Sequence, residues 1–295
     1  MASSAPSPTA LFDRRAWRIH RNRAATAGAV DFLHAEIGER LLDRLDLVNR
    51  EFPEVLDLGA RDGGLADRLA RRPGTKQVVL AEPAARLLAS ASGARVAADP
   101  ELTPFRDGCF DLVVSNLILH WTADLPGALV QLRRALRPDG MLLAALPGGQ
   151  TLIELRTALF EAELEEEGGV GPRVSPSVEL ADVAALLKRA GYALPVADSE
   201  TITVAYPDPL ALMRDLRGMG ETNALAARRR QFMRRATLAR AALIYAERFA
   251  EPDGRVPATF EVLFLCGWAP HPGQPRPLPR GSATARLADA LKSRE

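Results

Sequence analysis

Short runs of Val, Leu and Ala alternate with amphipathic segments along the first half of this 295-residue chain. The runs are almost continuously apolar, so each is expected to be a strand of a parallel sheet that is covered on both faces. The segments between them have helical spacing. The expected strands are residues 54–59, 77–83, 94–99, 110–117 and 138–147, and the expected helices are 63–71, 85–92, 124–136 and 150–167. This alternation predicts an α/β fold with a mostly parallel sheet.

The rest of the chain suggests further parts around this core. Residues 12–50 have one apolar stripe of helical spacing. Residues 208–250 are also helical in pattern and precede a last strand at 258–268, so they are interpreted as a lid inserted before that strand. The expected organisation is a helical segment at 1–50, a core at 51–206, the lid at 207–252, the final strand at 253–270 and an irregular Pro-rich tail at 271–295.

Composition excludes several classes of protein. The formal net charge is +1, and the arginine-rich segments lack the interleaved aromatic residues that nucleic-acid binding requires. No apolar run approaches the ~18 residues that a membrane span needs. The two cysteines, Cys109 and Cys266, have no CxxC spacing, which favours a reducing compartment over a disulfide scaffold. We expect a cytoplasmic location in a bacterium, or the matrix side in a mitochondrion.

Polar residues and glycines gather where the expected strands end. In an open parallel sheet, ligands bind beyond these carboxyl ends. Glycines let the backbone approach a ligand closely, and an acid after the second strand is placed to accept both ribose hydroxyls of a nucleoside. The candidates are Asp57, Gly59 and Gly63 after the first strand, Glu82 after the second, Asp99 after the third, and Ser115 and Asn116 after the fourth.

These acids favour S-adenosylmethionine (SAM) over a dinucleotide. Asp57 and Asp62 would repel a pyrophosphate, whereas SAM has no phosphate and carries an ammonium and a sulfonium group. Arg61 also interrupts the dinucleotide pattern G-x-G-x-x-G that Gly59 and Gly64 would otherwise fit. The Arg61 side chain either points away from the ligand or crowds its methionine end.

The turn "DLGARDG", the segment "TPFRDGCFDLVVSNLILHW" and the strand "LRPDGMLLAALP" resemble those of class I SAM-dependent methyltransferases. Over nearly the whole chain, "LFDRR", "GGQTLIELR", "EGGVGPRVSP", "GMGETN", "DGRVPATFEVLFLCGW" and "RGSAT" are similar to the mitochondrial complex I assembly factor 5 family and its bacterial relatives. The resemblance implies a Rossmann-like methyltransferase sheet with an antiparallel last strand, and SAM as cofactor. It also implies hydroxylation of an arginine in a complex I iron–sulfur subunit, with possible peripheral association with that membrane complex.

Two other functions remain open. A related branch, the malonyl-acyl-carrier-protein O-methyltransferases, implies ordinary methyl transfer to a carboxylate or a protein side chain. A non-catalytic chaperone could instead keep the fold and dock a partner through two basic clusters. These clusters are Arg14, Arg15, Arg18, Arg21 and Arg23, and Arg228, Arg229, Arg230, Arg234 and Arg235. Such clusters are also typical of solvated helix faces.

Candidates for catalysis are few. His120 and Trp121 follow the fourth strand and are placed to line a substrate opening, while Asn116 is placed to bind the methionine end of the cofactor. We predict no metal site. His34 and Glu36 lie two positions apart on an expected helix, where such residues do not face each other.

Overall fold

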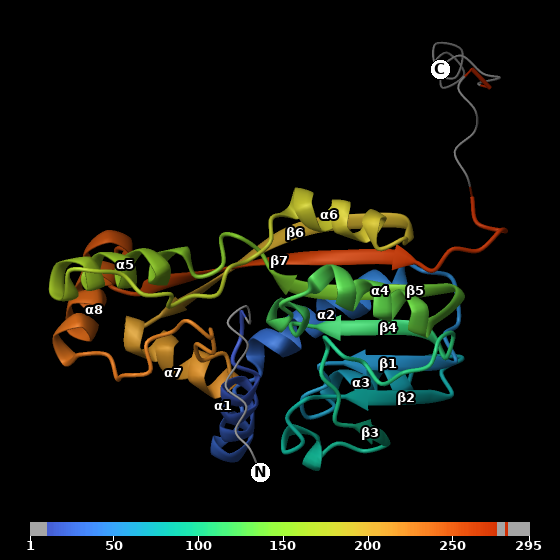
Figure 1. Cartoon of the computed structure of the whole chain (residues 1–295), viewed down its shortest axis with the longest axis horizontal. Coiled ribbons are helices and arrows are strands. Elements are labelled where there is room, and N and C mark those ends of the chain that lie inside the picture. Colours follow the sequence, from blue (N-terminus) through green and yellow to red (C-terminus); the bar gives the residue numbers. More distant parts are fainter. Residues whose placement is uncertain (1–10, 276–280, 283–295) are drawn as a thin grey trace.

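The computed structural model describes residues 11–275 and 281–282. These residues form a seven-stranded sheet with helices on both faces (Figure 1). The strand order is β3-β2-β1-β4-β5-β7-β6, and β7 runs antiparallel to both of its neighbours while the other neighbouring pairs are parallel. The strands are β1 (Glu54–Leu58), β2 (Gln77–Ala81), β3 (Ala94–Val96), β4 (Phe110–Asn116), β5 (Leu136–Pro147), β6 (Ala193–Tyr206) and β7 (Val256–Trp268). The mostly parallel sheet with an antiparallel last strand is therefore confirmed.

Helices connect the strands and form the N-terminal part of the fold. They are α1 (Arg14–Ala27), α2 (Phe32–Asp46), α3 (Gly64–Ala70), α4 (Leu125–Ala135), α5 (Ile153–Glu167), α6 (Leu180–Arg189), α7 (Pro209–Met219) and α8 (Arg235–Phe249), with 3-10 turns η1 (Leu87–Ala89) and η2 (Leu119–Trp121). Part of the tail, residues 276–280 and 283–295, lies outside the described residues, as do residues 1–10.

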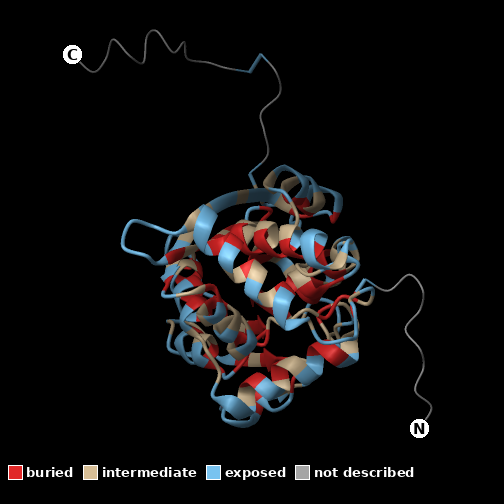
Figure 2. Cartoon of the chain, turned by 90° about the vertical axis from the view of Figure 1, so that its left-hand side faces the viewer, coloured by how far each residue is buried: buried red, intermediate tan, exposed pale blue. Residues whose placement is uncertain are grey.

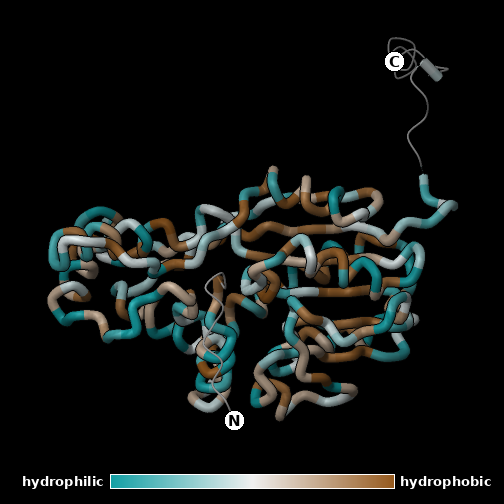
Figure 3. The backbone as a smooth tube through the Cα atoms, viewed as in Figure 1, coloured by the Kyte–Doolittle hydropathy of each residue, from teal (hydrophilic) through white to brown (hydrophobic). Residues whose placement is uncertain are grey.

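The two faces of the sheet belong to different hydrophobic clusters. Val55 packs into the cluster that contains Leu41 of α2, while the next residue, Leu56, packs into the cluster that contains Leu132 of α4. Successive side chains of a strand point to opposite faces, so a strand covered on both sides must be apolar throughout. Hydrophobic residues accordingly follow the strands (Figure 3). For this reason the strands of the sheet can be predicted from their apolar runs in the sequence.

The helices α5, α7 and α8 lie together at one end of the molecule, beyond β1 and β4 (Figure 1). The long strands β6 and β7 reach into this end, where α5 packs against α8 and β7. Helices α7 and α8 both fall within residues 207–252, the segment interpreted as a lid. Buried residues lie on the inner sides of the helices, and exposed residues cover the outside (Figure 2). We refer to α5, α7 and α8 as the lid helices.

Three expected helices differ from the observed ones. Residues 12–50 form two helices, because α1 ends before Gly28 and α2 begins only at Phe32. Residues 85–92 form only the short turn η1, since the chain enters β3 at Ala94 before a longer helix can develop. Residues 208–250 are interrupted between α7 and α8, where Gly220 adopts a left-handed conformation that ends α7.

Candidate cofactor and substrate site

The turn after β1 is shaped by two glycines. Gly59 and Gly63 have φ values of 86° and 92°, which favour glycine. A Cβ atom at Gly59 would lie 2.7 Å from the Cβ of Ile118, and one at Gly63 would lie 2.9 Å from the Cβ of Ala91. Both glycines are therefore required by the packing of the turn itself, whatever ligand it holds.

Asp57 ends β1 with a carboxylate that has no partner. The residue is fully buried, and neither carboxylate oxygen has a hydrogen-bond partner among the described residues. Burial, together with the negative charges of Glu82 and Asp62, raises the pKa of Asp57 to about 7. A buried carboxylate in this state favours a ligand that brings donors or a positive charge.

A cavity of about 230 Å³ lies beside Asp57. Asn116 also lines it, donating through Nδ2 to the carbonyl oxygen of His34 at 2.9 Å while its Oδ1 atom has no partner among the described residues. Gly59 and Asp62 complete one wall. We call this the Asp57 cavity. The strand-end residues predicted from β1 and β4 thus meet at one site.

Arg61 lies at the wall of that cavity and reaches from it to the lid. Its φ is 51°, and its buried guanidinium forms an ion pair with Asp31, just before α2, and donates to the carbonyl oxygen of Met219 at 2.9 Å. The residue still lines the Asp57 cavity. The side chain therefore joins the β1 turn to the end of α7.

Glu82 follows β2, as expected, but its carboxylate is already bound. Arg21 of α1 donates to it twice, from Nε at 2.9 Å and from Nη2 at 2.8 Å, and both side chains are essentially inaccessible to solvent. Asp99, the candidate after the third strand, is likewise paired, with Arg14 of the same helix at 3.2 Å. Helix α1 therefore covers the ends of β2 and β3.

Glu221 was not identified from the sequence, although it belongs to the "GMGETN" segment. One of its carboxylate oxygens, Oε2, contacts His120 Nε2 at 3.1 Å and accepts from Trp121 Nε1 at 2.9 Å, while Oε1 accepts from Arg21 at 3.4 Å. Burial tends to raise the pKa of Glu221, but His120, Arg21 and Arg61 outweigh it and lower the pKa. A carboxylate that three cationic or polar groups surround remains ionised.

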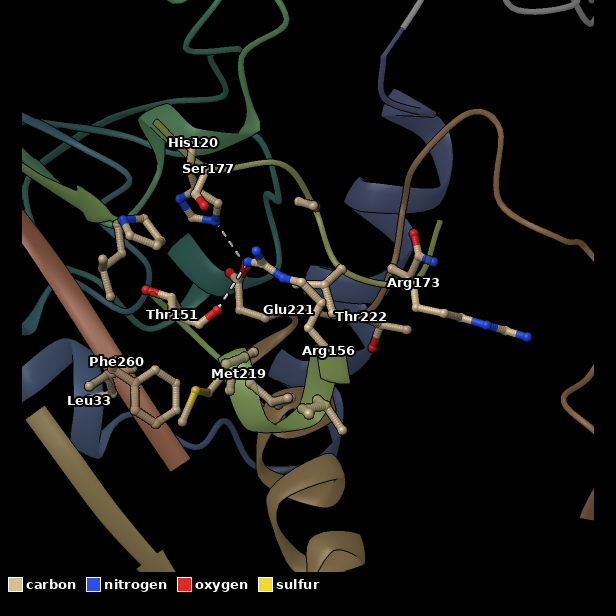
Figure 4. A pocket seen from close by; sticks show the side chains of 18 of the residues that line it. Leu33, His120, Thr151, Arg156, Arg173, Ser177, Met219, Glu221, Thr222 and Phe260 are labelled. Carbon is tan, nitrogen blue, oxygen red and sulfur yellow. Dashed lines mark hydrogen bonds and ion pairs between the residues drawn. The ribbon is translucent and has the colours of Figure 1, made fainter. Parts of the chain in front are cut away.

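A second cavity, of about 320 Å³, lies between the sheet and the lid helices (Figure 4). We call it the lid cavity. His34 lines both cavities, so they are neighbours. Apolar residues form most of its wall, including Leu33, Leu155, Leu159, Met213, Met219 and Phe260. His120 and Trp121 lie at this cavity, with His120 directed at Glu221 (Figure 4).

The charged side chains of the lid cavity are mainly cationic. Arg156, Arg173 and Arg217 line it together with two carboxylates, Glu221 and Glu261. Arg173 is paired with the buried Glu163. Arg156 forms no ion pair with a described residue, and its buried Nε has no hydrogen-bond partner there. An unpaired guanidinium beside an apolar wall is a potential contact for a carboxylate.

Several arginines of the two basic clusters are buried or already form ion pairs. Arg21 is buried, Arg14 pairs with Asp99 and Glu101, Arg228 with Asp13, and Arg229 with Glu167. Exposed members remain on both: Arg15, Arg18, Arg23, Arg230, Arg234 and Arg235. In the part of the chain that the structure describes, no group of three or more His, Cys, Asp or Glu residues could hold a metal ion. No helix of that part is long and apolar enough to cross a membrane.

The fold and the strand-end residues define the class of the protein. Residues 56–144 match the methyltransferase domain family, and the structure is similar to the YcgJ protein of Bacillus subtilis, with a TM-score of 0.54, 16% identity, and coverage of 78% of this chain and 98% of that one. The chain therefore has a class I methyltransferase fold.

Two sequence comparisons narrow the class. The human protein named arginine-hydroxylase NDUFAF5, mitochondrial, is 41% identical over 297 residues, covering 98% of this chain and 86% of the human one. A malonyl-[acyl-carrier protein] O-methyltransferase of Xylella fastidiosa is 35% identical over 272 residues, covering 88% and 89%. The chain belongs to the NDUFAF5 family, and the bacterial methyltransferases are its relatives.

Proposed function

We propose that this chain binds SAM and hydroxylates an arginine side chain in an iron–sulfur subunit of respiratory complex I. The observation that carries the proposal is the 41% identity, over almost the whole chain, to a protein named arginine-hydroxylase. Similarity of this extent includes the lid segments as well as the sheet. In a bacterial host we assign the reaction to the cytoplasm, and in a eukaryotic host to the mitochondrial matrix side.

The residues of the Asp57 cavity fit the amino-acid half of SAM. Among the described residues, neither carboxylate oxygen of Asp57 has a partner, which leaves both for a cationic group, and the amide oxygen of Asn116 has none either. The nucleoside half would need Glu82 and Asp99, which are present at the expected strand ends but are paired with Arg21 and Arg14. Neither the Asp57 cavity nor the lid cavity is lined by Glu82. When bound, SAM would supply an electrophilic methyl group, with Asp57 and Asn116 holding its amino-acid half.

The lid cavity has walls suited to an arginine side chain. Its apolar surface would cover the aliphatic stem, and the carboxylates Glu221 and Glu261 are acceptors for a guanidinium. Hydroxylation would insert one oxygen atom into a C–H bond, which is a two-electron oxidation of the substrate. The reaction therefore requires an oxidant as a second substrate.

The test is mass spectrometry of the iron–sulfur subunits in a host that lacks this gene. Re-expression of the wild-type chain should restore a gain of one oxygen atom on one arginine, and re-expression of Asp57→Asn should not. A gain of one methylene instead would mean methyl transfer. An unmodified arginine together with poorly assembled complex I would favour a chaperone. Normal complex I with biotin auxotrophy would contradict both roles and favour the acyl-carrier-protein methyltransferase.

A second candidate function is O-methylation of a carboxylate. The specific observation that favours it is Arg156, a cation that pairs with no described carboxylate and lies in a mainly apolar cavity. Such a site suits a substrate with an apolar body and a carboxylate. With methyl-labelled SAM, Arg156→Gln should then abolish ester formation on malonyl-acyl-carrier protein. The matched variant Arg214→Gln, which changes an exposed arginine of α7, should leave it intact.

A further inference from the structure

Arg21 holds Glu82 more completely than an ordinary surface ion pair would. The side chains of Arg21 and Glu82 are 1% and 0% exposed. Besides its two bonds from Arg21, the Glu82 carboxylate accepts from the backbone N–H groups of Ala84 at 3.1 Å and Arg61 at 3.4 Å. A carboxylate has about four acceptor positions, so this one is filled by the protein itself.

The same oxygens would be required by a nucleoside. An acid at this strand end is placed to accept the two ribose hydroxyls of SAM, and this step rests on the SAM binding proposed above. The ribose hydroxyls and the Arg21 guanidinium are both donors, so they compete for one set of lone pairs. Arg21 must give up at least one of its bonds before Glu82 can hold a ribose.

A second acceptor for Arg21 lies within reach. Its Nη1 atom is 3.4 Å from Oε1 of Glu221, the carboxylate that also contacts His120 and Trp121 at the lid cavity. The Arg21 side chain is enclosed. Its Cζ atom lies 5.8 Å from the centroid of the Trp17 ring, and a Cβ atom added at Gly220 would lie 3.1 Å from the Cα of Arg21. An enclosed guanidinium cannot be left without a carboxylate, because an unpaired buried charge is costly.

We propose that Arg21 is a positioning residue that exchanges between two carboxylates, Glu82 when the nucleoside site is empty and Glu221 when a nucleoside is bound. Binding of the nucleoside then strengthens the contact between α1 and residues 218–223. Since Glu221 also contacts His120 and Trp121, a stronger bond from Arg21 to Glu221 steadies the wall of the lid cavity. Nucleoside binding at Glu82 is thereby coupled to the shape of the lid cavity.

Affinity for two fragments of the cofactor tests the competition. Calorimetric titration of Arg21→Met should show adenosine and S-adenosylhomocysteine binding at least about tenfold more tightly than to wild type, because the competing donor has gone. Affinity for methionine, which needs only the Asp57 cavity, should not change. The melting temperature should fall, since Glu82 loses its partner. A purely structural arginine would not produce tighter binding together with lower stability.

Matched variants separate the causes. Arg18→Met changes an exposed arginine of α1 that makes only a 3.4 Å bond to the Arg14 carbonyl, and it should leave all affinities unchanged. Arg21→Lys keeps a cation and should bind adenosine nearly as wild type does. The double variant Arg21→Met with Glu82→Gln should regain stability and lose the gain in affinity. If Arg21→Met does not fold, Arg21→Gln takes its place: its neutral amide cannot make both bonds of the guanidinium to Glu82, so a smaller gain in adenosine affinity is expected.

Amide hydrogen exchange tests the coupling. Adenosine should slow exchange at residues 218–223 in wild type and should have no such effect in Arg21→Met. Equal slowing in both would overturn the exchange between carboxylates, and equal or weaker adenosine affinity in Arg21→Met would overturn the competition. If neither protein binds S-adenosylhomocysteine, the SAM assignment fails as well. If wild type and Arg21→Met bind S-adenosylhomocysteine with equal, measurable affinity, the SAM assignment is retained and only the proposed role of Arg21 is rejected.

Discussion

Asp57 and Glu82 end neighbouring parallel strands and are both completely buried, yet only Glu82 has a hydrogen-bond partner among the described residues. Two acids that look equivalent in the sequence therefore differ in their surroundings. The Glu82 carboxylate faces a guanidinium, and the Asp57 carboxylate faces no donor among the described residues. The difference comes from α1, which brings a guanidinium to one strand end and not to the other. It makes the two acids respond differently to substitution.

For Asp57, stability should depend on pH. Its pKa in the folded protein is about 7, against an ordinary value of 3.8, so the folded state holds a proton that the unfolded state has lost between these values. The contribution is fully present below about pH 4 and is lost as the pH rises through 7. The shift corresponds to about 4 kcal/mol. Asp57→Asn should therefore be more stable than wild type at pH 8, as measured by urea unfolding.

The two proteins should be about equally stable near pH 4, where Asp57 is neutral. Asp62→Asn, at an exposed position of the same turn, is the control and should show a much smaller difference. A constant difference between wild type and Asp57→Asn across this range would mean that Asp57 does not change its protonation.

Substitution of Glu82 should be costly even without a ligand. Glu82→Gln leaves the buried Arg21 with only the more distant Glu221, and breaking a buried ion pair in this way typically costs about 3–5 kcal/mol. Thermal unfolding of the apo protein measures the loss. Glu101→Gln, which removes a partly exposed partner of Arg14, should cost about 1 kcal/mol or less. Equal effects of the two changes would contradict the buried pair.

Arg61→Gly tests what the unusual turn residue contributes. Glycine relieves the left-handed backbone, which is worth about 1–2 kcal/mol, but removes the ion pair to Asp31 and the bond to the Met219 carbonyl. Since the guanidinium is buried, we expect the lost contacts to dominate and the melting temperature to fall. Leu194→Gly is the control, because Leu194 has a φ of 49° and is 45% exposed. If Leu194→Gly lost stability and Arg61→Gly gained it, the contacts of the Arg61 guanidinium would not be what stabilises the turn.

Arg156→Leu should be tolerated by the fold. Within the part of the chain that the structure describes, the buried Nε atom has no partner, and the guanidinium makes only two long bonds, of 3.4 Å and 3.3 Å, to the carbonyls of Gly149 and Thr151. Replacing such a group with an apolar side chain is usually neutral or stabilising. Urea unfolding should give a free energy equal to or above that of wild type. A loss of more than about 2 kcal/mol would make Arg156 a structural residue of α5.

The sequence predicted the sheet and the positions of the strand-end acids, because both depend on local patterns. Val55 and Leu56 are apolar since each faces a different layer of helices, and Asp57 follows them by chain order alone. The side chains that pair with these acids could not be predicted from the sequence. Arg21 is 61 residues from Glu82 and 200 from Glu221, and its helical spacing was equally consistent with a solvated face.

The pattern of α1 did contain one signal. Trp17 lies four positions before Arg21, on the same side of the helix, and both are buried. An arginine on the apolar side of an amphipathic helix needs a carboxylate partner, so the existence of the ion pair could have been expected although its partner could not.

The contact of α1 with the lid segment also has a consequence for the order of folding. Asp13 donates its backbone N–H to the carbonyl oxygen of Ala224 at 2.7 Å, and Ala226 donates to that of Leu11 at 2.9 Å. These groups come together only after more than two hundred intervening residues have left the ribosome, and contacts of such long sequence separation form slowly. The apolar side of α1 has an earlier partner as well, because the ring of Trp17 lies 5.7 Å from that of Trp121. The sheet can therefore cover Trp17 before residues 224–226 exist, and the docking of α1 on the lid segment is one of the last steps of folding.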